Sequence, residues 1–178
     1  GIKQDLGEAL RWYQRSAARG FAQSQYRVAT FYERGLGVPK DLARAKIWYQ
    51  RAAESGNVKA MHNLAVLSAG RTAQVPDYTT AARWFQAAAE HGLADSQFNL
   101  AVLYESGLGV TKQPADAHLW YALASRSGDE EAARRQKAIE AAMSPEELTE
   151  AAKRLAMWRT KPGDRVANDP LAASEAWK

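Results

Sequence analysis

Apolar and polar positions follow the spacing of amphipathic helices along most of this 178-residue chain. Between Leu42 and Ala53, apolar residues recur at intervals of three and four, which places them on one face of a helix. The arrangement returns every 36 residues, with an alanine three places before a tryptophan, an aromatic directly after it and a glycine eight places after it. The four pairs are Trp12-Tyr13, Trp48-Tyr49, Trp84-Phe85 and Trp120-Tyr121. Such a strict period indicates a repeat protein whose units pack on their neighbours.

Each unit is predicted to hold two helices, with the tryptophan on the second. The candidate N-caps of these second helices are Asp5, Asp41 and Asp77, whereas the last unit has Gln113-Pro114 instead, a different helix start. The first helices are predicted over residues 22–33, 58–69 and 94–105. Because tryptophan is the largest side chain of the motif, we expect each one to be buried between consecutive units. Truncating Trp84 would then cost about 3–5 kcal/mol.

These patterns predict an all-α fold, an α/α solenoid with a C-terminal capping helix. Residues 1–143 are assigned to the repeats, the first of them truncated and the last helix a charged cap. A capping box that begins at Ser144 opens the capping helix over residues 144–160. Residues 161–178, rich in Pro, Gly and small residues, are predicted as a linker or disordered tail.

The middle unit departs from the pattern at the turn after its first helix. The other two turns read Gly-Leu-Gly-Val, but here the sequence is Arg71-Thr72-Ala73-Gln74. Trp84 still arrives in phase, so only the turn chemistry has changed. We expect an altered or extended loop, either through drift of one repeat or for a function.

Basic residues are concentrated at the N-terminal end. Residues 1–51 carry ten Lys and Arg against four Asp and Glu, a net charge of +6, whereas residues 52–178 carry fourteen against sixteen, a net charge of −2. The absence of cysteine excludes disulfides and thiolate metal sites. No apolar run approaches the about 18 residues that span a membrane. The chain opens inside a repeat, so we expect a piece of a longer protein, attached to a membrane only through another segment.

The spacing Ala-x-x-Trp-Tyr-x-x-Ala-Ala-x-x-Gly, followed by Asn-Leu-Ala-x-x-Tyr and a Gly-x-Gly-Val turn, resembles the Sel-one-like repeat (SLR) family. That family is related to tetratricopeptide repeats (TPR), and the resemblance covers residues 1–128. It implies an SLR/TPR-like helix-pair solenoid with a concave groove lined by the first helices. It also implies an adaptor that binds protein partners rather than a catalyst.

Three segments, residues 62–67, 94–104 and 144–158, look like the repeat region of alphaproteobacterial PodJ-type polar localisation factors. In that family the repeats lie on the periplasmic side, between one membrane-spanning helix and a peptidoglycan-binding domain. This resemblance implies a periplasmic location as part of a membrane-anchored protein. A cytoplasmic location is the alternative.

The sequence offers no convincing catalytic constellation. His62, His91 and His118 lack metal-ligand spacing. Glu33 and Glu105 are equivalent carboxylates, but they lie two repeats apart. At about 8–10 Å for each packed helix, that separation exceeds the about 5–9.5 Å of a glycosidase pair. We therefore predict that the protein is not an enzyme and needs no cofactor.

The first candidate binding surface lies on the first helices, at the register of Arg27, Asn63 and Asn99. A ladder of these side chains along a concave groove can pair with the backbone of an extended peptide or with glycan hydroxyls. The same side chains can instead bond neighbouring helices and hold the repeats together. The two roles are not exclusive.

The second candidate surface is a basic stripe of Arg11, Arg15 and Arg19, spaced by four on one helix. It suits an acidic protein or wall polymer, although a solvated face is the simpler interpretation. Because the interleaved aromatics belong to the repeat core, they are not available to stack on bases, and we do not expect nucleic acid as a partner.

Together these features predict a non-catalytic interaction scaffold or adaptor. Its expected setting is the periplasmic region of a bacterial cell-pole organising protein that recruits signalling or cell-wall proteins. The alternative is a binder of peptidoglycan fragments, or a regulator of a cell-wall enzyme, that uses the same groove.

Overall fold

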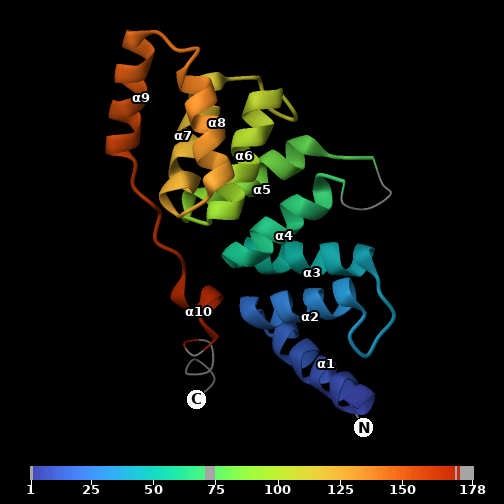
Figure 1. The fold of residues 1–178 in the computed structure, drawn as a ribbon. Coiled ribbons are helices and arrows are strands. Elements are labelled where there is room, and N and C mark those ends of the chain that lie inside the picture. Colours follow the sequence, from blue (N-terminus) through green and yellow to red (C-terminus); the bar gives the residue numbers. More distant parts are fainter. Residues whose placement is uncertain (1, 71–74, 171, 173–178) are drawn as a thin grey trace. The chain divides into compact units, whose positions relative to one another are not determined.

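A computed structural model describes residues 2–70, 75–170 and 172, and within these the fold is helical with no strand (Figure 1). The predicted all-α fold is confirmed. The helices are α1 (Ile2–Ala18), α2 (Ala22–Arg34), α3 (Leu42–Glu54), α4 (Val58–Ser68), α5 (Tyr78–Glu90), α6 (Ala94–Ser106), α7 (Pro114–Arg126), α8 (Glu130–Glu140), α9 (Pro145–Met157) and α10 (Arg165–Asn168). The turn Arg71–Gln74 lies outside the described residues, so its altered geometry stays a prediction.

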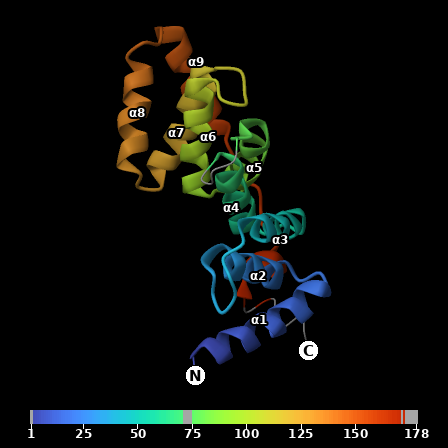
Figure 2. The same cartoon turned by 90° about the vertical axis from the view of Figure 1, so that its right-hand side faces the viewer.

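The described helices form two compact units. The first holds α1 to α3, α4 as far as Leu67, and the chain from Pro162 onward. The second holds Ser68–Gly70 and the chain from Val75 to Lys161, with α5 to α9. In the first unit α2 packs between α1 and α3 (Figures 1 and 2), and in the second α6 packs against α5 and α7. Within each unit these helices pack on their neighbours in sequence, as in a solenoid.

Polar side chains start the helices where the sequence indicated. Asp41 accepts a hydrogen bond from the Arg44 amide at 2.9 Å, and Asp77 caps α5 in the same way. Ser144 and Glu147 form the predicted capping box of α9. Asp5 is different, because α1 begins at Ile2 and Asp5 lies inside its first turn. Its negative charge there stabilises the positive end of the helix dipole without capping it.

The Gly-x-Gly turn after α6 requires glycine because the backbone comes very close to α5. Gly109 has a φ of +70°, and a Cβ atom added there would lie 2.2 Å from the carbonyl carbon of Tyr78. A side chain at this position would both strain the backbone and push the turn off α5.

The interior is built from alanines and from the aromatic that follows each tryptophan. Tyr49 and Tyr121 are fully buried, and Phe85 is 3% exposed. Alanines on both helices of each pair allow the backbones to approach closely around these rings. Those with no exposed surface include Ala29, Ala45, Ala65, Ala81, Ala101 and Ala117.

The expectation that every tryptophan is buried between units is wrong. Trp12 is 60% exposed, Trp48 and Trp84 are half-buried, and only Trp120 is buried. The reason is angular: neighbouring residues point about 100° apart around a helix, and it is the residue after the tryptophan that faces the core. The half-exposed rings are stacked with arginines instead, as where the Arg51 guanidinium lies 4.7 Å from the Trp48 ring centre.

The capping helix α9 covers the outer face of α7 (Figure 1). The rings of Trp120 and Trp158 meet edge to face with centres 4.9 Å apart. Arg154 pairs with Asp116 at 2.5 Å. These contacts bury the one tryptophan of the four repeats that is shielded from solvent, so the predicted C-terminal capping helix is confirmed.

The described part of the predicted tail is folded rather than a plain linker. In the second unit, the Lys161 amide donates to the Glu90 carbonyl at 2.8 Å, and its ammonium pairs with the Glu90 carboxylate. In the first unit, α10 packs on α2, and buried Asn57 donates to the Ala167 carbonyl at 2.6 Å. Asn168 completes this contact by donating to the Gly56 carbonyl and accepting from the Val58 amide.

The burial pattern predicts a sharp difference between two aromatic truncations. Phe85→Ala should lower the free energy of unfolding by about 3–5 kcal/mol because it leaves a cavity in the core. Trp12→Ala should cost less than about 1 kcal/mol because its ring is mostly solvated. Urea denaturation followed by far-UV circular dichroism measures both, and equal losses would contradict the assignment of core positions.

Candidate interaction surface

The register of Arg27, Asn63 and Asn99 continues into α8 as Arg135. The sequence reasoning missed this fourth member, although the same 36-residue spacing identifies it. The contacts of Arg135 in the structure show which groups a side chain at this register can bond.

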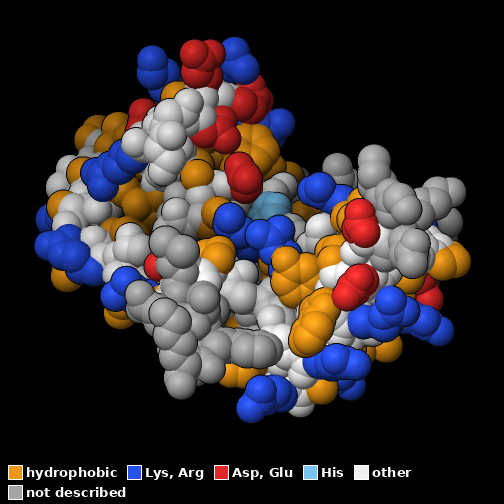
Figure 3. Space-filling model, turned by 90° about the horizontal axis from the view of Figure 1, so that it is seen from below, with side chains coloured by type: hydrophobic (Ala, Val, Ile, Leu, Met, Phe, Trp, Pro, Cys, Tyr) orange, Lys and Arg blue, Asp and Glu red, His pale blue; other side chains and the backbone are white. Residues whose placement is uncertain are grey.

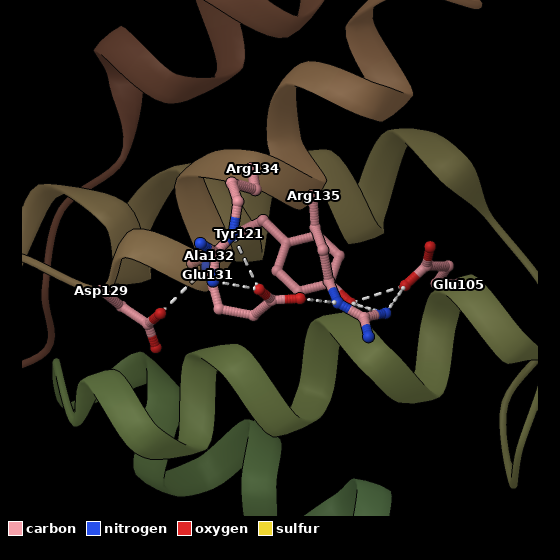
Figure 4. A network of polar contacts seen from close by, with 7 residues as sticks. All are labelled: Glu105, Tyr121, Asp129, Glu131, Ala132, Arg134 and Arg135. Atoms are coloured by element: carbon pink, nitrogen blue, oxygen red, sulfur yellow. Dashed lines mark hydrogen bonds and ion pairs between the residues drawn. The ribbon is translucent and has the colours of Figure 1, made fainter.

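In the second unit, Arg135 binds side chains of three helices (Figure 4). Its guanidinium donates to the Glu105 carboxylate at 2.8 Å and to the Tyr121 hydroxyl at 3.4 Å. The Tyr121 hydroxyl in turn donates to Glu105 at 2.6 Å. Glu131, one turn earlier on α8, accepts from the Arg135 Nε at 3.0 Å. The arginine thereby ties α8 to both α6 and α7.

The ionisation behaviour of this network follows from its burial and its bonds. Burial, and then the hydrogen bond to Glu105, raise the pKa of Tyr121 above its ordinary range. Hydrogen bonds from Arg134 and Arg135 lower the pKa of Glu131. Tyr121 thus stays a neutral donor at neutral pH, and its hydroxyl lies between the Glu105 carboxyl and the Arg135 guanidinium.

The first unit repeats the arrangement two repeats earlier. The Tyr49 hydroxyl donates to Glu33 at 2.6 Å and lies 3.4 Å from the Thr30 hydroxyl. The Asn63 side chain, at the register of Arg135, lies near the Tyr49 hydroxyl and acts to lower its pKa. Burial and the bond to Glu33 raise the pKa of Tyr49 as well. We call these two triads, Glu33–Tyr49–Asn63 and Glu105–Tyr121–Arg135, the polar seam.

The intervening repeat lacks the polar seam. Ala69 stands at the position of the glutamate and Phe85 at that of the tyrosine. With no hydroxyl to meet, Asn99 donates to the backbone carbonyl of Asp95 on its own helix, at 2.7 Å. Both members of the tyrosine–glutamate pair have changed together, as expected for groups that would each be left without a partner by the loss of the other.

The three residues of the predicted ladder, Arg27, Asn63 and Asn99, therefore have different surroundings in the structure. The Asn63 side chain lies near the Tyr49 hydroxyl of the preceding helix, an arrangement that fits the packing role that the sequence left open. Arg27 is exposed on α2, and Asn99 bonds locally on α6. Arg27 and Asn63 belong to the first unit and Asn99 to the second. A recognition role for Arg27 and Asn99 stays a prediction.

The basic stripe lies on the surface. Arg11, Arg15 and Arg19 are all exposed, and the Arg15 guanidinium lies 5.2 Å from the ring centre of exposed Trp12. Figure 3 shows Lys and Arg side chains among hydrophobic ones on one face of the molecule. In the stripe itself, Arg15 and Trp12 present a charge and an apolar ring side by side.

The histidines and the equivalent carboxylates serve structural contacts. Buried His118 lies 2.8 Å from Glu140 and lowers the pKa of that carboxyl by hydrogen bonding. His91 meets the Lys161 carbonyl at 3.2 Å. Across the described ranges, His, Asp and Glu form no group that could hold a metal ion. Among the helices that the structure describes, none is both long and apolar enough to cross a membrane.

Comparison with known proteins agrees with this architecture. The family model for the Sel1 repeat matches residues 1–21, 22–57, 58–93 and 94–129. The chain belongs to the Sel1 repeat family. Sel1 repeat proteins in general mediate protein–protein interactions and form a family of non-catalytic scaffolds. A search of curated proteins gave no match.

Two solved Sel1-type structures resemble the chain. A Sel1 repeat protein from Oxalobacter formigenes is 29% identical with a TM-score of 0.61, and the match covers 73% of this chain and 56% of that one. A protective antigen of uropathogenic Escherichia coli strains, which displays an SLR fold, is 23% identical with a TM-score of 0.50, covering 99% of this chain and 46% of that one. The chain thus spans about half the length of these relatives, and the second shows the fold only.

The polar seam predicts different effects for two equivalent asparagines. Asn63→Ala should cost about 1 kcal/mol, the usual net value of a lost hydrogen bond, because Tyr49 loses a donor. Asn99→Ala removes only a bond to its own helix and should change stability by less than about 0.5 kcal/mol. Both changes make the same gain in helix propensity, so the difference in urea midpoints reports the Tyr49 contact, and equal midpoints would contradict it.

The raised tyrosine pKa values predict a loss of stability in alkali. Below pH about 10, where unfolded tyrosine is still neutral, their contribution is complete. Above it the unfolded chain releases these protons first, so stability falls as pH rises toward the folded pKa values of Tyr49 and Tyr121. Urea midpoints from pH 8 to 11 should fall less steeply in the Tyr49→Phe/Tyr121→Phe variant, and an unchanged slope would contradict the assignment.

Proposed function

We propose that this chain is the interaction region of a bacterial cell-pole organising protein, on the periplasmic side of the membrane. In this role it holds signalling or cell-wall proteins at the pole and carries out no chemistry. The resemblance of residues 62–67, 94–104 and 144–158 to PodJ-type repeat regions supports the setting.

The observation that carries the interaction role is the exposed basic and aromatic surface of the first unit. Arg11, Arg15 and Arg27 are exposed there, and Trp12 is 60% exposed. With a net charge of +6 over residues 1–51, an acidic protein would be steered toward this end of the chain. Exposed tryptophan and arginine are also the residue types that contribute most to protein interfaces.

A binder of peptidoglycan fragments is the second candidate. Arg27 and Asn99 are its recognition residues, because a guanidinium and an amide can bond glycan hydroxyls and peptide carboxylates. Asn63 is the third candidate at this register, and its side chain also lies near Tyr49.

Affinity capture from a periplasmic extract, with and without added muropeptides, tests both candidates. Our proposal predicts a retained protein that muropeptides do not release and that an Arg11→Glu/Arg15→Glu variant captures several-fold less. The exposed charges contribute about 0–1 kcal/mol to stability, so the variant should melt like the unmodified chain.

The matched control is Arg134→Glu/Lys137→Glu, which reverses two charges on α8 and should capture normally. Release by muropeptides, together with loss of capture in an Arg27→Ala/Asn99→Ala variant, would favour the peptidoglycan candidate. Capture of neither a protein nor a muropeptide would contradict both.

A further inference from the structure

The outer faces of the second helices offer one surface several times, and among the described residues the copy on α7 is buried whereas the copy on α3 is largely exposed. On α7, which packs against α9, this face consists of Leu119, Trp120 and Leu123, each 5–7% exposed. The equivalent residues of α3 are Ile47, which is 53% exposed, Trp48, which is half-buried, and Arg51, which is exposed. Leucine and isoleucine thus stand at one repeat position, buried in one copy and open in the other.

The covered copy shows how a helix binds this face. Arg154 in the last turn of α9 and Trp158, the C-cap residue that follows this helix, lie four residues apart and both reach α7. Trp158 meets Trp120 edge to face at 4.9 Å, and Arg154 pairs with Asp116, one turn before the tryptophan. A helix that carries an aromatic and a charge at this spacing can therefore bind a helix that carries a tryptophan and the opposite charge.

On α3 the residue that corresponds to Asp116 has the opposite charge. Arg44 stands where α7 has Asp116, and its side chain is 64% exposed beside Asp41 at 3.2 Å. Arg51 adds a second cation 4.7 Å from the Trp48 ring centre. A helix carrying arginine at the α9 position would place like charges together here, whereas a helix carrying glutamate or aspartate would pair with Arg44.

We propose that the outer face of α3, formed by Arg44, Ile47, Trp48 and Arg51, binds an amphipathic helix of a partner protein that carries an acidic residue four places before an aromatic. The aromatic packs on Trp48 and Ile47, and the carboxylate pairs with Arg44. This inference rests on the proposed interaction role and specifies one surface and its partner. A second copy does not fit, because its α9 presents Arg154 to Arg44.

The helix α9 itself supplies the probe. Two fluorescein-labelled peptides are compared by fluorescence anisotropy, one with the sequence of residues 144–158 and one with Arg154→Glu in that sequence. The unmodified full chain should bind the reversed peptide at least tenfold more tightly than the natural one. In an Arg44→Asp chain, which restores the charge of α7, the order of the two affinities should invert.

Two further variants locate the binding. Ile47→Asp should weaken binding of the reversed peptide at least tenfold, since it places a charge in the apolar contact. Arg27→Asp reverses an exposed charge of the same unit on α2 and should leave the order of affinities unchanged. Circular dichroism confirms that each chain is folded, and the inverted order with Arg44→Asp is a gain that misfolding cannot imitate.

Several results would overturn the proposal. These are absence of saturable binding of the reversed peptide, an order of affinities that Arg44→Asp does not change, and an equal effect of Arg27→Asp. Sedimentation of the unmodified chain as a dimer that Ile47→Asp dissociates would assign the face to a second copy instead. If the peptides fail while the chain still captures a periplasmic protein, only this inference falls; if capture fails too, the proposed function falls with it.

Discussion

The aromatic that follows each tryptophan is the residue on which the packing of this solenoid depends. Tyr49, Phe85 and Tyr121 are the large side chains at the centre of each helix pair, and the alanines around them set how closely the backbones approach. A buried hydroxyl, however, needs an acceptor. Glu33 and Glu105 provide it in the two tyrosine repeats, each at 2.6 Å. A polar side chain of the following helix completes each cluster: Asn63 lies near Tyr49 in one unit, and Arg135 donates to Glu105 in the other. A tyrosine rather than a phenylalanine at this position is thus accompanied by polar residues on the two neighbouring helices.

Much of this was available from the sequence because repeats provide their own comparison. The 36-residue period located the repeat helices and the caps Asp41 and Asp77, and the Ser-Pro-Glu-Glu pattern located the capping box of α9. It did not tell which of two adjacent aromatics faces inward, since both positions recur with equal strictness and a helix pattern tolerates either. Features that occur once gave no such comparison. Asn57 stands where the other units have Phe21, Leu93 and Asp129, and its burial depends on α10, which is 110 residues away in sequence.

The middle repeat shows that the residue at the register of Asn63 and Arg135 can have different contacts in different repeats. Where Phe85 replaces tyrosine and Ala69 replaces glutamate, no buried polar group has to be satisfied. Asn99 then turns to its own helix and is no longer needed for cohesion. The same amide type thus holds helices together in one repeat and is released from that task in another. The residue type at this register therefore could not tell a packing role from a recognition role. The difference depends on the residue fourteen positions earlier, which is Tyr49 for Asn63 and Phe85 for Asn99.

On the outer faces of the second helices, the residue composition varies with whether another helix covers the face. On α7, leucines at positions that other repeats give to arginine leave an apolar face that would be poorly solvated without α9, so the capping helix and its site are matched in composition. On α3 the isoleucine and tryptophan remain, but arginines surround them and keep the surface soluble. Such a face can stay open in water and still bury apolar area when an acidic helix neutralises the arginines. Charge at the rim therefore decides which helix the apolar centre accepts, and a single repeat position serves both cohesion within the chain and selection of a partner outside it.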